Sequence, residues 1–321
     1  MSRTPRLNLF QSLGPHGFHR VAYTEWGNPN ARHIVVCVHG LTRNSRDFDE
    51  LAAELADWGC RVVCMDVVGR GDSDWLEHKE DYGFALYLSD AAALLARLTA
   101  LSDRYRLLRR MQGESGRLKI DWVGTSMGGL IGMMLAGKTD SPIRRLVLND
   151  VGPLVPWHAL ARLKLMDSGA GARFADLAEV ERHMRDACST FGPLEDGQWR
   201  RLARHGSRRR EDGAYTLAYD PAIVSHMRRS GNAGVEFGKD FLLGIDLWPV
   251  WDAVRCPTLV LRGEDSDLLL ESTVRRMRER GPHVELVEFP GIGHAPWLMS
   301  DEQVGAVRKF LLAPEPSKSD R

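Results

Sequence analysis

Short runs of apolar, mostly β-branched residues recur along the chain, with segments of helical character between them. Six such runs are HIVVCVHG, CRVVCMDVVG, KIDWVGTS, IRRLVLND, TLVLRGE and HVELVEFPG. Strands that are apolar nearly throughout are buried on both faces, and helical spacers make the connections between them parallel crossovers. The pattern therefore predicts an α/β fold with a doubly wound, mostly parallel sheet.

Two further strand-like stretches precede these runs. RLNLFQS and HRVAYTEWG are separated by the turn-forming residues LGPHG. Two such stretches joined by a short glycine- and proline-containing connection are typical of a β-hairpin. We expect this hairpin at the edge of the sheet.

The alternation of strands and helices breaks between Asp150 and about Pro257. This segment is predicted to be helical and contains no strand-like run before TLVLRGE. A helical block inserted between two strands of one sheet indicates a cap. We therefore divide the chain into a first part of the core, residues 1–151, a helical cap insertion, residues 152–247, and a second part of the core, residues 248–321.

Composition narrows the range of partners. At 321 residues and 43% hydrophobic, the chain can bury a large core. Lys plus Arg equals Asp plus Glu, at 43 each, so the charge gives no reason to expect nucleic acid or an anionic membrane as a partner. The basic run RRLARHGSRRRED is predicted to be a solvated helix face. The expected partner is a small molecule, and the sequence does not indicate an oligomeric state.

Cysteines and apolar segments bear on the cellular compartment. The five cysteines are an odd number without C-x-x-C spacing, which predicts buried reduced thiols. The first twenty residues contain no apolar core of the kind that a signal peptide needs, and no stretch approaches the ~18–20 apolar residues of a membrane span. We expect a soluble, cytoplasmic protein.

A candidate nucleophile lies in the segment VGTSMGG. Residues Gly124 to Gly128 fit the pattern G-x-S-x-G, after a predicted strand and before a predicted helix. In that context a sharp turn strains the backbone of Ser126, and the glycines allow close approach of neighbouring chain. The amino terminus of the helix would favour a developing negative charge. An idle serine in a glycine-rich turn is the alternative, and the context favours the nucleophile.

A serine hydroxyl needs a base to take its proton. His294, in PGIGHAPWLM after the last strand-like run, can reach over the Ser126 turn. His39 also ends a strand, but Gly40 and Leu41 follow it. There the Leu41 N–H can join the Met127 N–H in an oxyanion hole, which leaves His39 a structural role.

The base in turn needs a carboxylate to orient it. TLVLRGEDSDLLL supplies Asp265 and Asp267 after a strand. The chain order of serine, acid and histidine is then the one that accompanies a G-x-S-x-G turn in an α/β sheet. Of these two carboxylates we favour Asp267.

These motifs resemble those of the α/β-hydrolase fold enzymes, in their capped, esterase and epoxide-hydrolase-like group. The resemblance covers nearly the whole chain, in VHGLTRNSRDF, DVVGRGDSD, GTSMGGLIG, LVLND, LRGEDSD and GIGHAP. In that family the acid usually comes three residues after the glycine that ends the strand, and here that place, counted from Gly263, is Ser266. The turn resembles a variant, R-G-x-x-S-D, whose final aspartate serves, which again favours Asp267. Some relatives carry the acid where Asp150 stands, so Asp150 stays a third candidate.

The identity of the residue at the turn, serine rather than aspartate, limits the class of reaction. Relatives that open epoxides use an aspartate at this turn, so a serine implies acyl transfer. The sequence predicts a Ser-His-Asp hydrolase of carboxylic esters that needs no metal and no cofactor. Carbon–carbon bond hydrolysis of a diketone, lactone opening, and a ligand-binding receptor on the same fold remain alternatives, because fold alone implies no function.

Other residues near these motifs carry weaker expectations. Asp66 and Arg70, in MDVVGRGDSD, are expected to shape a loop beside the site rather than to react. Four tryptophans lie in or at the edges of the predicted cap, and at least one is expected to line an apolar pocket, with plain packing as the alternative. They are Trp157, Trp199, Trp248 and Trp251.

Overall fold

An eight-stranded sheet forms the centre of the protein in the computed structural model, which describes residues 4–104, 118–156, 159, 170–224 and 245–314. The strand order is β1-β2-β4-β3-β5-β6-β11-β12. The strands are β1 (Arg6–Gly14), β2 (Gly17–Trp26), β3 (His33–Val38), β4 (Arg61–Met65), β5 (Lys119–Thr125), β6 (Ile143–Asn149), β11 (Thr258–Gly263) and β12 (Val284–Phe289). All six apolar runs form strands of this sheet, as the sequence predicts.

The direction of the strands also follows the prediction. β3, β4, β5, β6, β11 and β12 pair in parallel, whereas β1 and β2 form an antiparallel hairpin whose second strand pairs antiparallel with β4. β1 lies at the edge of the sheet. The fold is therefore a mostly parallel α/β sheet with an antiparallel edge.

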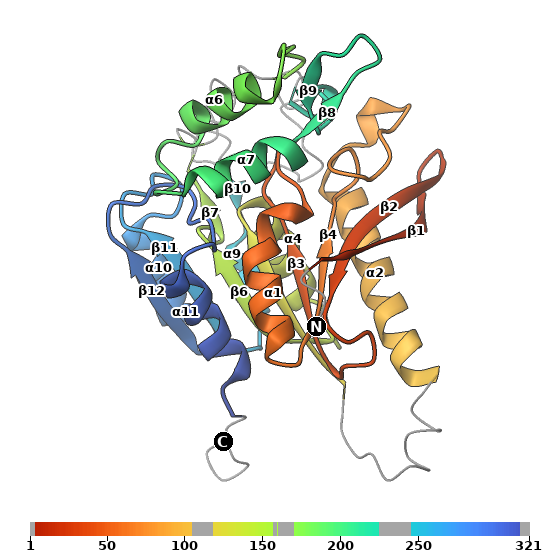
Figure 1. Ribbon diagram of the computed structural model, residues 1–321. Helices are drawn as coiled ribbons and strands as arrows, with labels where there is room; N and C mark the ends of the chain where they lie inside the picture. Colours follow the sequence, from red (N-terminus) through yellow and green to blue (C-terminus); the bar gives the residue numbers. More distant parts are fainter. Residues whose placement is uncertain (1–3, 105–117, 157–158, 160–169, 225–244, 315–321) are drawn as a thin grey trace.

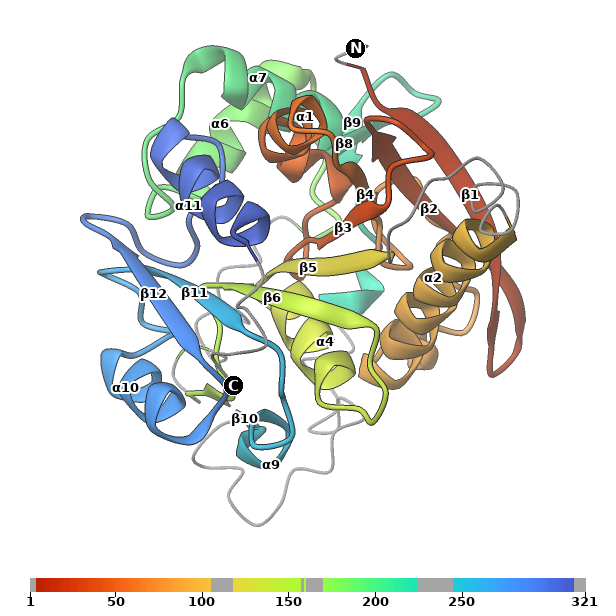
Figure 2. The ribbon, with the colours of Figure 1, turned by 90° about the horizontal axis from the view of Figure 1, so that it is seen from below.

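Helices cover both faces of the sheet (Figure 2). On one face lie α1 (Asp49–Asp57) and α11 (Asp301–Leu312), and on the other lie α2 (Phe84–Arg104), α4 (Met127–Ala136), α9 (Trp248–Trp251) and α10 (Glu271–Arg280). Successive strand residues point to opposite faces, so Val35 and Cys37 belong to one buried cluster while Val36 and Val38 belong to the other. This explains why the strands are apolar throughout.

The segment between β6 and β11 places residues 177–217 over one end of the sheet (Figure 1). It contains β7 (Leu154–Val155), α6 (Leu177–Ala187), α7 (Asp196–His205), β8 (Ser207–Arg209), β9 (Tyr215–Leu217), β10 (Ile245–Asp246) and α9. Residues of α6 and α7 pack against Trp297 and Met299 from the loop that follows β12. The inserted segment is thereby attached to the loop that carries His294.

The expectation that this segment lacks strands is wrong at two places. β8 pairs with β9 in an antiparallel hairpin, and β7 pairs with β10. The β8–β9 turn contains Asp212 and Gly213, and the φ of Gly213 is 88°. Asp-Gly is a hairpin signal, but strands this short show no readable periodicity. The basic run divides between α7 and β8 rather than forming one helix face.

All five cysteines are free, and four of them are buried, which agrees with the predicted reduced thiols. They are Cys37, Cys60, Cys64, Cys188 and the partly buried Cys256.

Two short 3-10 helices also lie in the described residues, η1 (Ser45–Phe48) and η2 (Lys79–Asp81). Among the described residues, no helix combines the length and the apolar character that crossing a bilayer would require.

Candidate active site

Ser126 lies in a strained turn between β5 and α4. Its φ of 51° and ψ of −114° place it in a region that residues other than glycine rarely adopt. The glycines on either side are required by close approach: a Cβ on Gly124 would lie 2.3 Å from Gly128 C, and one on Gly128 would lie 2.0 Å from Val38 O. The Ser126 N–H donates to Asn149 O at 3.0 Å, which ties the turn to the end of β6. The pattern thus forms the sharp strand-to-helix turn predicted from the sequence.

A chain of two hydrogen bonds runs from this serine to a buried carboxylate. His294 Nε2 lies 3.0 Å from Ser126 Oγ, and His294 Nδ1 lies 2.7 Å from Asp150 Oδ2. Both His294 and Asp150 are buried. A carboxylate accepts only, so Nδ1 carries the proton and Nε2 is left to accept the serine hydroxyl. This is the tautomer that a general base for Ser126 requires.

Asp150 is held in place by the end of the neighbouring strand β11. Its φ is 55°, and its N–H donates to Leu261 O at 2.8 Å. Its carboxylate accepts hydrogen bonds from Gly263 N at 2.9 Å and from Ser266 Oγ at 2.6 Å, besides the one from His294. The acid therefore projects from the end of β6 and is fixed by donors of β11 and the turn that follows it.

This arrangement corrects the expectation that Asp267 orients His294. The carboxylate that meets the imidazole is that of Asp150, the third candidate. Ser266, at the place where the family usually has its acid, is buried and donates to Asp150, whereas Asp265 is exposed and Asp267 is only partly buried. The strand that carries Asp150 ends beside both β5 and β11, so its last residues reach Ser126 and Ser266 alike. The position of Asp150 directly after a strand was the available signal in the sequence.

The loop after β3 passes against Ser126. An ideal Cβ on Gly40 would lie 3.8 Å from Ser126 Cβ, so Leu41 follows a point of close contact with the turn. Met127 is the first residue of α4. The structure brings the two residues with the predicted oxyanion donors to the same end of the sheet as Ser126.

His39 holds this loop from within. Its Nε2 accepts the Val67 N–H at 3.0 Å, and its Nδ1 lies 2.7 Å from Gly40 O, to which it donates. Burial lowers the pKa of His39 from 6.5 to about 3, so the ring is neutral. These contacts agree with the structural role that the sequence indicates for His39.

Arg70 and Asp66 also hold loops, as their sequence context indicates. Arg70 Nε donates to Leu41 O at 2.8 Å, and its Nη1 donates to Tyr87 Oη at 2.9 Å. Asp66 accepts the N–H groups of Ser45 and Asp72 at 2.6 and 2.9 Å. Burial raises the pKa of Asp66 to about 6, although these two backbone donors act against the rise. The Leu41 carbonyl is thus fixed by a buried guanidinium.

A cavity of about 180 Å³ opens above Ser126 and His294. Its described lining is mostly apolar and comes from the core loops and the inserted segment, including Leu41, Met184, Phe191, Leu217 and Trp297. The tryptophan of this lining was not among the four expected. Of those four, Trp199 packs edge-on against Trp297 with ring centroids 5.6 Å apart, Trp248 and Trp251 are buried in the core below, and Trp157 lies outside the described residues.

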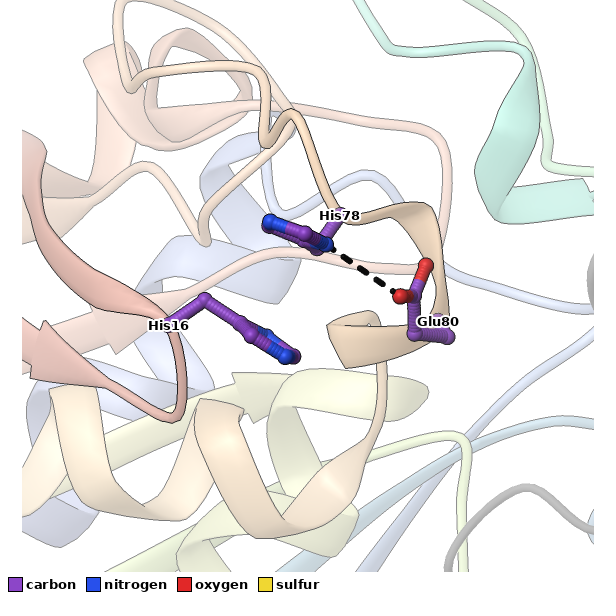
Figure 3. A group of neighbouring side chains, drawn as sticks. All are labelled: His16, His78 and Glu80. Carbon is purple, nitrogen blue, oxygen red and sulfur yellow. Dashed lines mark hydrogen bonds and ion pairs between the residues drawn. The ribbon is translucent and has the colours of Figure 1, made fainter.

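One group of side chains in the described part of the chain has the composition of a metal site. The ligand atoms of His16, His78 and Glu80 lie within 4.8 Å of one another on the surface (Figure 3). The two imidazole rings are stacked, with centroids 4.0 Å apart and planes 17° from parallel, and His16 Nδ1 is 2.8 Å from Asp81 Oδ2. Lone pairs in nearly parallel rings do not converge on one ion. None of these residues lines the cavity beside Ser126.

The fold and this site define an α/β hydrolase, and the comparisons agree. Residues 35–307 match the alpha/beta hydrolase family, so the chain belongs to that family and is a hydrolase. It is 40% identical over 314 residues to a 3-hydroxybutyrate-oligomer hydrolase of Cupriavidus necator, covering 97% of this chain and 99% of that one. It is 26% identical over 278 residues to an esterase of Mycobacterium tuberculosis, covering 84% of this chain and 80% of that one. The crystal structure of an alpha/beta hydrolase from Novosphingobium aromaticivorans superposes with a TM-score of 0.76 at 33% identity, covering 97% of this chain and 99% of that one.

Proposed function

We propose that this protein hydrolyses carboxylic esters through a catalytic triad of Ser126, His294 and Asp150. The observation that carries the proposal is the continuous hydrogen-bond chain from Ser126 Oγ through both ring nitrogens of His294 to Asp150 Oδ2. Nucleophile, base and acid are thereby in the order and tautomer that acyl transfer needs. Asp150 takes the role for which Asp267 was first considered.

The reaction follows from this geometry. Ser126 Oγ attacks the ester carbonyl carbon while His294 Nε2 takes its proton, and Asp150 stabilises the imidazolium that forms. The proton then passes to the leaving alkoxide, so that an alcohol departs and an acyl-enzyme remains. A water molecule, deprotonated by His294, cleaves the acyl-enzyme to the acid and restores Ser126.

The developing oxyanion requires donors in place before the attack. We assign them to the backbone N–H groups of Leu41 and Met127, each worth about 2.7–4 kcal/mol in comparable sites. Support comes from the contact of Gly40 with the Ser126 turn, from the place of Met127 at the start of α4, and from the hydrogen bond of Arg70 to Leu41 O. That bond restrains the peptide after Leu41, while the hydrogen bond from His39 Nδ1 to Gly40 O, at 2.7 Å, restrains the peptide that carries the Leu41 N–H.

The substrates that we favour are linear oligoesters of a short hydroxy acid. The relative that is 40% identical over nearly its whole length is a 3-hydroxybutyrate-oligomer hydrolase. A small, mostly apolar cavity suits a short aliphatic acyl group. Ester cleavage is therefore preferred over carbon–carbon or lactone hydrolysis, although the same triad could perform either, and we assign the inserted segment as a cap that shapes this cavity.

The test is covalent labelling together with turnover. A serine-reactive fluorophosphonate should label the protein once, on Ser126, by peptide mapping, and Ser126→Ala should not be labelled. The wild type should turn over p-nitrophenyl butyrate and the 3-hydroxybutyrate dimer repeatedly, and Ser126→Ala should turn over neither. Labelling at another residue, or equal turnover by the variant, would remove Ser126 as the nucleophile. Stoichiometric release without turnover would favour a receptor on this fold.

A further inference from the structure

Arg43 places a positive charge in the wall of the cavity. It follows the loop of Leu41, and its side chain is only 14% exposed. An ideal Cβ on Gly40 would lie 3.9 Å from Arg43 Cγ and 3.8 Å from Ser126 Cβ. The stem of Arg43 and Ser126 therefore flank the same residue, and both side chains line the same cavity.

Only one edge of this guanidinium is occupied. Arg43 Nε and Nη2 donate to the two carboxylate oxygens of Asp47 at 2.8 and 2.7 Å. The remaining terminal nitrogen, Nη1, points toward Met184 Sδ at 4.0 Å, its one hydrogen-bond contact in the described residues. A thioether is a weak acceptor, and a guanidinium has five N–H donors. The end of the group, formed by Nη1 and the outer hydrogen of Nη2, is thus available to an oxygen ligand.

The surroundings hold this free end in position. The guanidinium carbon lies 5.3 Å from the centre of the Trp297 ring, a cation–π contact that adds to the two bonds from Asp47. Met184 of α6 and Trp297 after β12 both belong to the cavity lining. A buried, restrained guanidinium edge matches the two oxygens of a carboxylate, which it can bind bidentately.

We propose that Arg43 forms a carboxylate-binding subsite that holds the free acid end of the substrate. The inference rests on the proposed function, and it specifies the substrate as an ester whose chain ends in a carboxylate a few bonds from the scissile carbonyl. A linear oligomer of a hydroxy acid meets that description, since its ester links leave one free carboxylate. Asp47 does not repel this group as a lone carboxylate would, because its charge is paired with the other edge of Arg43.

The test compares two substrates that differ only in this charge. The wild type should cleave the 3-hydroxybutyrate dimer with a kcat/KM about tenfold or more above that for the methyl ester of the same dimer, the lower range for a hydrogen bond to a charged group. Arg43→Gln should bring the ratio of the two values close to one. Arg46→Gln is the matched control, because Arg46 of η1 pairs with Asp49 of α1 and does not line the cavity, so its ratio should stay that of the wild type.

A binding measurement separates this inference from the proposed reaction. Calorimetry on Ser126→Ala should give a lower Kd for the free acid dimer than for its methyl ester, and this difference needs neither turnover nor a folded Arg43 variant. Equal Kd values, or an Arg43→Gln variant that keeps the wild-type ratio, would overturn the subsite. If the wild type cleaves neither dimer but binds the free acid more tightly, the subsite stands and the proposed oligoester hydrolysis fails.

Discussion

The Ser266 hydroxyl donates a hydrogen bond of 2.6 Å to Asp150 Oδ2. The same oxygen lies 2.7 Å from His294 Nδ1. Ser266, which follows β11, thus supports the carboxylate that contacts His294, although this carboxylate follows another strand, β6.

Asp150→Asn should lower kcat by up to about 10⁴-fold while the protein stays folded, because an amide favours the wrong tautomer of His294 and cannot stabilise the imidazolium. Asp267→Asn and Asp265→Asn are the controls and should cost far less. Kinetics on p-nitrophenyl butyrate, with melting curves for each variant, check this. A dead Asp267→Asn beside an active Asp150→Asn would restore the first expectation from the sequence.

Exchanging the two side chains should recover part of the activity. In the double variant Asp150→Ser/Ser266→Asp, the carboxylate starts from the usual place after β11, and the serine that now stands at position 150 can donate to it. We expect kcat about tenfold or more above that of Asp150→Ser alone, since a hydrogen bond to a charged group returns. If the double variant is no more active than the single one, the carboxylate at position 266 does not reach His294.

The acid side of the stability profile should depend on His39. The folded-state pKa of His39 is about 3 and its unfolded value is 6.5, so between these values only the unfolded chain binds the proton. Its contribution is present above pH 6.5 and is lost as the pH falls, by about 2 kcal/mol between pH 7 and pH 5. His39→Gln should reduce this loss in urea unfolding, whereas the exposed His283→Gln should leave it unchanged. Equal losses in wild type and His39→Gln would contradict the prediction.

The turn at Ser126 should not tolerate a methyl group on its glycines. A Cβ at Gly128 would lie 2.0 Å from the Val38 carbonyl oxygen, which belongs to a central strand and cannot move aside. Gly128→Ala should therefore be insoluble or inactive.

Gly305→Ala is the contrasting variant. Gly305, in α11, has open space around it, so an alanine there should raise the free energy of unfolding by about 0.5–1 kcal/mol through its higher helix propensity. Thermal unfolding of both variants decides this, and a well-folded, active Gly128→Ala would show that the turn can relax.

Phe191 should influence the choice of acyl chain. It comes from the inserted segment, lines the cavity, and lies 6.2 Å from His294 between ring centroids. Phe191→Ala should change the ratio of kcat/KM between butyrate and longer acyl esters, because removal of the ring enlarges the cavity in which we propose that the acyl chain binds. Trp199→Phe, which alters packing behind the lining, should lower the melting temperature and leave that ratio flat. An unchanged ratio in Phe191→Ala would mean that this ring does not contact the acyl chain.

The sheet is predictable from the sequence because each central strand is buried on both faces, so that it appears as a continuous run of apolar residues. Ser126 and His294 are predicted because each follows a strand at a recognisable turn, and the structure brings the two side chains within hydrogen-bond distance. The carboxylate that contacts His294 is harder to predict. The choice among Asp150, Asp265 and Asp267 depends on the left-handed φ of Asp150 and on which side chain of the next turn is buried. Both are set by contacts between strands far apart in the sequence.

Arg43 shows the same limit. Its position in a loop is plain from the sequence, but its pairing with Asp47 and its free edge toward Met184 depend on the packing of α6 against the loop after β12. The β8–β9 hairpin was missed because each strand has only three residues.

The hydrogen bond between His294 and Asp150 also changes where the proposed triad lies along the chain. Ser126 and Asp150 both precede the inserted segment and stand on neighbouring strands, so the spacing between them is independent of the length and sequence of the insertion. Only His294 arrives from beyond it. A change in the insertion, by natural divergence or by exchange for the corresponding segment of another hydrolase, can therefore displace His294 while Ser126 and Asp150 keep their places at the ends of neighbouring strands. For engineering, the inserted segment could therefore be exchanged while residues 126 and 150 stay in place. The one contact to check would be the packing of the His294 loop against the new segment.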